Sequence, residues 1–389
     1  MFGYGAAAPD CQNNFSFIIY KLILLCYNKP KAYPMKFRRK DKIMSVTKTH
    51  YAFMPDGTEV HLFTITNNNE ISAGIITKGA TLNSFTCPDK DGNMGDIIMG
   101  FDTIDYHISS GTYTGQVIGQ YANRLCGGKF KVGDTEYQVT QNEKGKTCLH
   151  GGAEYSSEVW KAIIIDDNAV EFTYHSPDGR EGFPGNVDVT VVYRLTDRNE
   201  LEINYKAVSD KDTIINMTNH AYFNLGTIAN GDVLDHELML NCDYYTPTDA
   251  DSIPTGEIRS VKGTAFDFTM PKKIGKEIGA DDEQLIQCRG YDHNFCVNGE
   301  AGKLRLVAKV TDEKSGRKLE VMSDLPGVQL YTGNFLDGSE IGKGGIALQK
   351  HYGFCLETQY YPDTPNQASF PQCTFKAGEK FESTTIFKV

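Results

Sequence analysis

Short stretches of alternating hydrophobic and polar residues, separated by turn residues, follow one another along most of the chain after residue 44. Residues 59–66 alternate imperfectly and end at a run of three asparagines. Residues 187–195 and 200–208 flank a four-residue turn, and a third strand is predicted over 213–222. An alternation with a period of two places successive side chains on opposite faces of a strand. The pattern therefore predicts a series of strands joined by short turns.

Further pairs of short strands are predicted on both sides of this meander. A hairpin is predicted over 130–139 around a glycine–aspartate turn, and the segments 304–310 and 318–322 flank another turn. Helical periodicity is confined to 276–287, which predicts one short helix. The chain has 38 glycines and 14 prolines to form turns, and it shows no internal repeat or linker. Residues 44–389 are therefore predicted to form one all-β domain, a sandwich or a barrel.

The first 43 residues have a different character. Residues 15–27 form an apolar run that is interrupted by Lys21 and is shorter than the roughly 20 residues needed to span a membrane. No Lys or Arg precedes this run and no small-residue cleavage site follows it, so it does not match a secretory signal peptide. We expect residues 1–43 to be an extension outside the catalytic fold, with no membrane partner, and the catalytic domain to cover residues 44–389.

Composition and charge argue against a nucleic-acid-binding protein and against a zinc site formed by cysteines. The net charge is −11 and no long run of Lys or Arg is present, so nucleic acid is not an expected partner. None of the ten cysteines forms a Cys-x-x-Cys pair or has a neighbour at zinc-ligand spacing. Their irregular spacing indicates reduced thiols and a cytoplasmic location. A glycosylation sequon at 216–218 supports this location, because a glycan there would obstruct His220, a candidate catalytic residue.

Two segments each place one proton-transfer group on a predicted strand. In 218–226, His220 shares a strand face with Tyr222 and with amide and hydroxyl side chains, and in 354–363, Glu357 shares a face with a cysteine and a glutamine. Amides and hydroxyls beside an aromatic ring are typical of a sugar-binding groove. A histidine and a glutamate facing one small molecule can act as a general acid and a general base. A single histidine or glutamate on a strand more often has a structural role, so the catalytic interpretation depends on further motifs in the chain.

The further motifs occur at 119–128, 149–152, 176–185, 253–256, 291–294 and 326–334. Together with the two segments above, and in this order, they resemble the motifs of the aldose 1-epimerases, also called galactose mutarotases. The resemblance extends from near residue 44 to the C-terminus. It implies a large antiparallel β-sandwich, the galactose mutarotase-like supersandwich. It also implies that the protein interconverts the α and β anomers of free hexoses such as galactose and glucose.

The resemblance implies roles for individual residues. His220 would be the general acid and Glu357 the general base, while the sugar would be held by Asn123, Arg124, His150, Tyr222, Asp292 and Gln329. Asp292 would also help to keep His220 protonated. The expected partner is a small sugar, and we expect a monomer or a weak dimer. No metal and no other cofactor is expected, because the chain has no P-loop, no nucleotide-binding glycine motif and no His-Glu-x-x-His.

In the implied reaction, Glu357 takes the proton of the C1 hydroxyl while His220 gives a proton to the ring oxygen. The ring opens, rotation about C1–C2 exposes the other carbonyl face, and the ring closes again. Three alternatives stay open. An epimerase of hexose 6-phosphates would need additional basic residues, a glycosidase usually uses two carboxylates, and a non-catalytic sugar-binding protein of this fold could lose His220 or Glu357.

Overall fold

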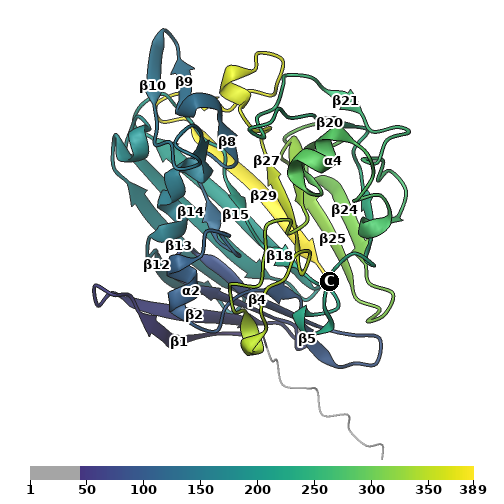
Figure 1. Ribbon diagram of the computed structural model, residues 1–389. Coiled ribbons are helices and arrows are strands. Elements are labelled where there is room, and N and C mark those ends of the chain that lie inside the picture. Colours follow the sequence, from purple (N-terminus) through teal and green to yellow (C-terminus); the bar gives the residue numbers. More distant parts are fainter. Residues whose placement is uncertain (1–43) are drawn as a thin grey trace, which may run out of the picture. The chain divides into compact units, whose positions relative to one another are not determined.

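The computed structural model describes residues 44–389, and the expectation about residues 1–43 lies outside the described residues. Strands dominate this part of the chain, and those that form sheets pair antiparallel, so the all-β prediction is confirmed (Figure 1). The described helices are short: α2 (Ile104–Ser109), α3 (Glu154–Ser157) and α4 (Glu283–Cys288), with 3₁₀ turns η1 (Cys126–Gly128), η2 (His150–Ala153), η3 (Arg180–Gly182), η4 (Ile228–Asn230), η5 (Ile274–Lys276), η6 (Lys343–Gly345) and η7 (Thr364–Asn366).

The largest sheet has nine strands, most of which lie side by side in Figure 1. Their order is β12 (Lys161–Asp166), β13 (Ala169–Ser176), β14 (Val187–Leu195), β15 (Glu200–Ser209), β29 (Lys380–Lys388), β25 (Lys318–Ser323), β24 (Arg305–Thr311), β19 (Glu237–Leu240) and β22 (Lys272–Lys273). In β14, every second side chain from Val187 to Leu195 is buried. The alternation read from the sequence therefore marks one face turned toward the core.

The second sheet has seven strands and carries the polar segments singled out in the sequence. Its order is β21 (Arg259–Ser260), β20 (Tyr244–Thr246), β23 (Asp292–Cys296), β26 (Gly327–Tyr331), β27 (Phe354–Gln359), β18 (Tyr222–Phe223) and β6 (Ile98–Met99). Every residue of β27 is buried. Phe354 and Leu356 belong to the main hydrophobic core, whereas Cys355 and Glu357 face the opposite way. One face of this sheet thus packs on the core, and the other is free to form a site.

Smaller sheets complete the fold. A five-stranded sheet has the order β1 (Ser45–Phe53), β2 (Glu59–Thr66), β3 (Ser72–Ile76), β4 (Thr81–Pro88) and β5 (Met94–Asp96). Two-stranded pairs are formed by β8 (Arg124–Leu125) with β11 (Cys148–Leu149), β7 (Val117–Ile118) with β17 (Thr218–Asn219), β9 (Lys129–Val132) with β10 (Thr135–Gln138), and β16 (Thr213–Ile214) with β28 (Thr374–Phe375). The hairpin predicted over 130–139 is β9 and β10.

The nine-, seven- and five-stranded sheets share one hydrophobic core. The ring centroids of Phe223 in β18 and Phe387 in β29 lie 4.9 Å apart, which joins the seven-stranded sheet to the nine-stranded sheet. The rings of Phe63 in β2 and Phe172 in β13 lie 5.8 Å apart and join the five-stranded sheet to the same core. Packing of two sheet faces against each other is the architecture of a β-sandwich, as predicted.

Two predicted elements differ from the structure in their extent. The strand predicted over 213–222 is three short strands, β16, β17 and β18, because each pairs with a different partner: β28, β7, and β27 with β6. The helix predicted over 276–287 is limited to α4. Asp282 caps its N-terminus by accepting a hydrogen bond from the Gln284 backbone N–H at 2.9 Å, and Arg289 ends it in a left-handed conformation (φ 56°).

No helix within residues 44–389 is long and apolar enough to cross a bilayer.

His107 in α2 makes the stability of the fold sensitive to acid. The side chain is 1% exposed, and burial, helped by the charge of Lys78, lowers its pKa to about 3. An unfolded chain binds a proton at this residue with a pKa of about 6.5. The stability gained by keeping His107 neutral is therefore complete above pH 6.5 and is lost as the pH falls toward 3. Between pH 7 and pH 5 the loss is about 2 kcal/mol.

We expect the variant His107→Gln, which has no titratable group, to lose about 2 kcal/mol less unfolding free energy than the wild type between pH 7 and pH 5. Urea denaturation of both proteins at the two pH values measures this difference, in which the contributions of all other groups cancel. Equal losses in the two proteins would show that His107 is protonated in the folded state.

Candidate active site

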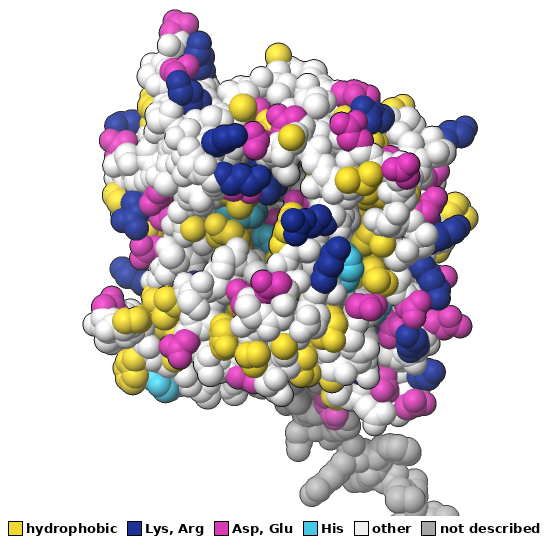
Figure 2. Space-filling model, in the orientation of Figure 1, with side chains coloured by type: hydrophobic (Ala, Val, Ile, Leu, Met, Phe, Trp, Pro, Cys, Tyr) yellow, Lys and Arg dark blue, Asp and Glu magenta, His cyan; other side chains and the backbone are white. Residues whose placement is uncertain are grey.

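A cavity of about 350 Å³ opens on the polar face of the seven-stranded sheet. Its wall is formed by Gly111, Thr112, Tyr113, Asn123, Arg124, Glu143, Lys144, Leu149, His150, His220, Tyr222, Ser252, Asp292, Tyr331, Phe335 and Glu357. Figure 2 shows histidine side chains at the bottom of a hollow in this face, with basic and hydrophobic side chains around it. Aromatic side chains beside convergent polar groups are typical of a small-molecule site.

Strand register places the polar side chains of the cavity floor. Tyr222, Cys355, Tyr331 and Asp292 are direct neighbours across β18, β27, β26 and β23, so their side chains form one row on one face of the sheet. The next row on that face is Glu357, Gln329 and Asn294. Groups that are far apart in sequence thus come together because four strands share this register.

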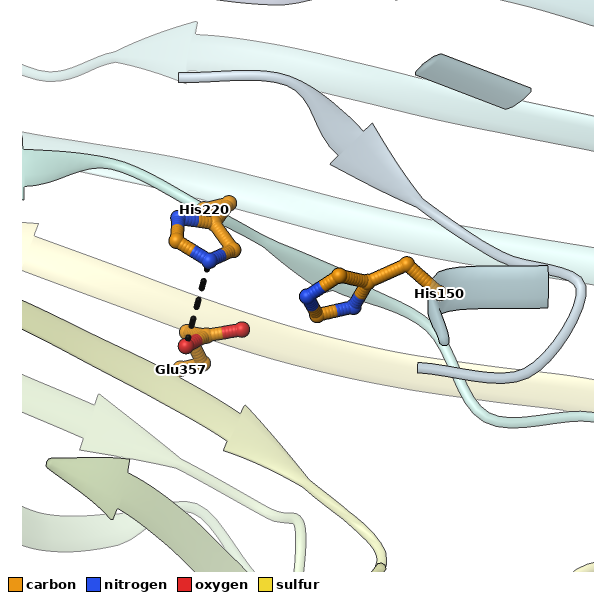
Figure 3. A group of neighbouring side chains, drawn as sticks. All are labelled: His150, His220 and Glu357. Atoms are coloured by element: carbon orange, nitrogen blue, oxygen red, sulfur yellow. Dashed lines mark ion pairs between the residues drawn. The ribbon is translucent and has the colours of Figure 1, made fainter. Parts of the chain in front are cut away.

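His220 and Glu357 face each other at the bottom of the cavity (Figure 3). The Nε2 atom of His220 lies 3.6 Å from Oε1 of Glu357, and their side chains are 7% and 3% exposed. Oε2 of Glu357 is buried and has no hydrogen-bond partner among the residues that the structure describes. An unpaired buried carboxylate oxygen is costly unless a ligand completes it. This oxygen is therefore a candidate contact for a ligand hydroxyl.

The backbone holds His220 at its position between β17 and β18. Its N–H donates to the Gln116 carbonyl and its carbonyl accepts from the Gly115 N–H, both at 2.9 Å. On the side chain, Nδ1 lies 3.6 Å from Sγ of Cys355, its neighbour on β27. Nδ1 is occupied by the thiol, so Nε2 is the ring atom left to face Glu357 and the cavity.

Burial sets the proton affinities of the pair. It lowers the pKa of His220 to about 4, and it raises the pKa of Glu357 well above its ordinary value, a rise that the charge of Asp292 increases and that of Arg124 reduces. The expectation that Asp292 helps to keep His220 protonated is wrong. Burial dominates at His220, and the contacts of Asp292 are with Arg124 and Gln329.

His150 forms the wall beside the pair, with ring centroids 5.2 Å from His220 (Figure 3). The Asn123 N–H donates to Nδ1 of His150 at 3.2 Å, and the His150 N–H donates to the Asn123 carbonyl at 3.0 Å. Burial lowers the pKa of His150 well below its ordinary value, so the ring is neutral. Since Nδ1 accepts a hydrogen bond, the proton of the neutral ring is on Nε2. His150 therefore offers a hydrogen-bond donor to a ligand.

His150, His220 and Glu357 also have metal-ligand chemistry, because one donor atom from each lies within 4.8 Å of the others. Two histidines and a carboxylate can hold a divalent ion. The protonated Nε2 of His150 does not suit this use, since a metal ligand needs a free lone pair. The expected absence of a metal stays a prediction.

Arg124 in β8 is held between two carboxylates. Its Nε and Nη2 atoms donate to the two carboxylate oxygens of Glu143, both at 2.9 Å, and Nη1 lies 3.7 Å from Oδ2 of Asp292. Burial opposes the charge on Arg124, but the two carboxylates outweigh it and raise its pKa further. Gln329 donates its Nε2–H to Oδ1 of Asp292 at 2.7 Å. The cation and both acids are thus fixed before any ligand binds.

The structure brings together the residues that the sequence singled out. His220, Glu357, Asn123, Arg124, His150, Tyr222 and Asp292 line the cavity. Gln329 is not part of the wall but lies next to it, where it supports Asp292. Its contact with a sugar stays a prediction.

Sequence reasoning did not propose several side chains of the wall, among them Tyr113, Glu143, Tyr331 and Phe335. Tyr331 lies within the matched segment 326–334 and could have been found from its place on the same strand face as Gln329. Tyr113 and Glu143 belong to turns without a motif. Tyr113 (φ 55°), Asn123 (φ 64°) and His150 (φ 53°) all have left-handed backbone conformations. Strain of this kind is concentrated at ligand sites, because the surrounding structure must hold it in place.

Gly115 links the cavity to the core, and we expect Gly115→Ala to lower the unfolding free energy by about 2–4 kcal/mol. Gly115 has φ +73°, and a Cβ there would lie 2.2 Å from the Leu82 carbonyl oxygen. Since its N–H bonds to the His220 carbonyl, the same change displaces His220. Denaturant unfolding measures the loss, and Gly111→Ala, where no atom lies within 4 Å of the added Cβ, is the matched control. A variant as stable as the control would contradict this account.

Comparison with known proteins identifies the family. A family model described as aldose 1-epimerase matches residues 61–388. The chain belongs to the aldose 1-epimerase family. Galactose mutarotase of Bos taurus is similar, with 41% identity over 348 residues that cover 89% of this chain and 99% of that protein. The aldose 1-epimerase of Escherichia coli (strain K12) is 36% identical over 340 residues, which cover 87% of this chain and 97% of that protein.

Solved structures of this family have the same fold. The crystal structure of galactose 1-epimerase from Lactobacillus acidophilus NCFM superposes with a TM-score of 0.78 at 29% identity, and the match covers 89% of this chain and 98% of that one. The aldose epimerase homologue from C. elegans gives a TM-score of 0.74, also at 29% identity, over 82% of this chain and 95% of that one. The predicted galactose mutarotase-like sandwich is confirmed.

Proposed function

We propose that this family member is an aldose 1-epimerase that interconverts the α and β anomers of free hexoses, with Glu357 as the general base and His220 as the general acid. The observation that carries the proposal is the buried pair at 3.6 Å in the wall of a cavity, where Glu357 Oε2 has no hydrogen-bond partner within residues 44–389. A base and an acid on one side of a small cavity suit a substrate whose two reacting oxygens are bonded to the same carbon.

The reaction needs two proton transfers and one bond cleavage. Glu357 as carboxylate takes the proton from the C1 hydroxyl, and His220 as imidazolium gives its proton to the ring oxygen. The C1–O5 bond breaks, and a C1 carbonyl and a C5 hydroxyl form. After rotation about C1–C2, Glu357 returns its proton to the carbonyl oxygen and His220 takes the proton of the C5 hydroxyl. The other anomer is released and both residues regain their starting states.

His220 and Glu357 together carry the same number of protons at the start of the reaction and after the ring has opened, but the proton lost by His220 is balanced by the one that Glu357 gains. With the closed sugar the pair is imidazolium and carboxylate, and with the open sugar it is neutral imidazole and carboxylic acid. Burial favours the neutral form of each group, since it lowers the pKa of His220 to about 4 and raises that of Glu357. These shifts favour the proton arrangement that the pair has with the open-chain sugar.

The charges of the cavity favour a free sugar over a sugar phosphate. The wall carries three carboxylates, Glu143, Asp292 and Glu357, against two cations, Arg124 and Lys144. Arg124 already forms its fork with Glu143. A phosphate dianion needs donors that are free of carboxylates. Neutral hydroxyls instead suit the side chains proposed to hold the sugar: Asn123, Arg124, His150, Tyr222, Asp292 and Gln329.

The test is polarimetry on freshly dissolved α-D-galactose and α-D-glucose, with and without protein. We expect faster mutarotation that persists after exhaustive treatment with a chelator, since the mechanism uses protein side chains alone. Parallel assays with hexose 6-phosphates and with an aryl glycoside separate the alternatives. Activity on the phosphates only, release of reducing sugar from the glycoside, or no activity on any substrate would each replace the proposed reaction.

We also propose that residues 44–389 are sufficient for activity and that residues 1–43 lie outside the catalytic fold. Every residue of the cavity lies after residue 110, and the family model begins at residue 61. A protein starting at Met44 is expected to keep the unfolding free energy and the mutarotation rate of the full chain. Loss of folding or of turnover in the shorter protein would overturn this proposal.

The proposal also covers the cellular location and the oligomeric state of the protein. We propose a reducing, cytoplasmic location, which the eight unpaired cysteines of residues 44–389 support. We also propose a monomer or weak dimer, because the cavity wall contains all the groups that the mechanism needs within one chain. Sedimentation of the purified protein measures the second property.

A further inference from the structure

Glu143 lines the cavity but has no role in the mechanism above. Its side chain is 19% exposed and comes from the turn between β10 and β11. Both carboxylate oxygens accept hydrogen bonds from Arg124, Oε2 from Nε and Oε1 from Nη2, each at 2.9 Å. A planar guanidinium that meets both oxygens of a carboxylate has one preferred orientation. Glu143 therefore decides which edge of Arg124 faces the cavity.

The backbone around Glu143 is fixed on both sides. The Glu143 N–H donates to the Thr147 carbonyl at 3.0 Å, and the Glu143 carbonyl accepts from the N–H groups of Lys146 and Thr147 at 3.0 and 3.1 Å. The preceding Asn142 pairs its side-chain amide with the backbone of Leu149, at 2.8 and 2.9 Å. Glu143 is thus not a loosely tethered surface charge, and its turn is tied to the residue just before His150.

The paired hydrogen bonds between Arg124 and Glu143 leave Nη1 of Arg124 and Oδ2 of Asp292 available to a ligand. Nη1 of Arg124 lies 3.7 Å from Oδ2 of Asp292, which is too long for a hydrogen bond. Asp292 Oδ1 is occupied by Gln329, so Oδ2 and Nη1 are the parts of this pair that a ligand hydroxyl can reach. Without Glu143, the guanidinium can turn and donate a hydrogen bond to Oδ2 of Asp292. Both groups would then be occupied by each other and lost to the ligand.

We propose that Glu143 is a positioning residue for sugar binding: it holds the Nε and Nη2 edge of Arg124, so that Nη1 and Asp292 stay available for sugar hydroxyls. This inference rests on the proposed function. Glu143 acts on binding through Arg124, and it does not move a proton in the reaction.

The kinetic test compares Glu143→Ala with the wild type. We expect KM for galactose to rise about tenfold while kcat stays within about threefold, because binding groups are lost and the acid and base are kept. Glu143→Asp, which keeps the carboxylate, should recover at least half of the loss on a logarithmic scale. The matched control is Glu136→Ala, since Glu136 forms a single surface ion pair with Lys129 at 3.1 Å and is half exposed. An unchanged KM, or a fall in kcat alone, overturns the proposal.

A second measurement does not depend on catalysis. The Nε–H signal of Arg124 in ¹⁵N-labelled protein should exchange slowly with water in the wild type and in Glu136→Ala. It should exchange at least about tenfold faster in Glu143→Ala. The midpoint of thermal unfolding of this variant should lie within about 2 °C of that of the wild type. Slow exchange in Glu143→Ala shows that Glu143 does not hold Arg124. A further outcome is that the exchange rates follow the expectation while the wild type does not accelerate mutarotation. In that case the proposed function fails and Glu143 still holds Arg124, but its role in sugar binding is overturned.

Discussion

Glu357→Gln is expected to slow mutarotation by about 10²–10⁴-fold, or about 3–5 kcal/mol of transition-state stabilisation. Glutamine keeps the size of the side chain and one carbonyl oxygen, but it cannot take the proton of the C1 hydroxyl. Sugar affinity should fall only modestly, because the binding groups Asn123, Arg124 and Asp292 are unchanged. The unfolding free energy should stay equal or rise, since the substitution removes a buried ionisable group whose pKa is raised by burial.

Polarimetry gives the rate of this variant, and calorimetry gives its affinity for galactose. The matched control is Glu154→Gln. Glu154 is also a buried carboxylate, 2% exposed, but it accepts hydrogen bonds from Tyr174 and Ser176 and does not line the cavity. The control should keep the wild-type rate. Near-normal turnover of Glu357→Gln would show that Glu357 is not the base, and the proposed mechanism would fall with it.

His220→Asn is expected to lower the rate by a similar factor, through the loss of the proton donor to the ring oxygen. Asparagine is polar and smaller, so the variant should fold, and its backbone bonds to Gly115 and Gln116 are kept. The double variant with Glu357→Gln should cost less than the sum of the single changes. The two groups act as a unit: once one proton transfer is lost, the other contributes little.

A double-mutant cycle of mutarotation rates measures this coupling. Strict additivity of the two single effects would contradict the expectation that the two groups of the pair at 3.6 Å act as a unit. Circular dichroism and denaturant unfolding of all three variants show whether a loss of rate is a loss of fold.

The alternation of the sequence predicted the long strands well, because these strands have one face on the core. The predicted strand 59–66 coincides with β2, and 187–195 coincides with β14. The same reasoning failed at 213–222, where every residue of β16, β17 and β18 is buried and no polar face marks where one strand ends. Local patterns there contain no information on which partner strand each segment takes.

The candidate site was predicted in part. The types of His220 and Glu357 indicated acid and base chemistry, and the resemblance supplied the sugar-binding residues. Their meeting depends on pairs such as Tyr222 with Cys355 and Gln329 with Glu357, which join segments distant in the chain. The proton affinities were not predictable either. The sequence suggested a histidine kept protonated by Asp292, whereas burial at the bottom of the cavity lowers its pKa to about 4.

Strand periodicity and the order of motifs can be read along the chain, and they were enough to predict the class of fold, the family and the chemical groups of the site. The contact of Glu143 with Arg124 became visible only in the folded chain. A glutamate beside lysines and a glycine in a turn is normally a solvated charge, and nothing local links it to Arg124. The guanidinium and the carboxylate meet because β8 and β11 pair and the turn folds back over them. Long-range packing sets such contacts, together with the desolvation that gives them their strength.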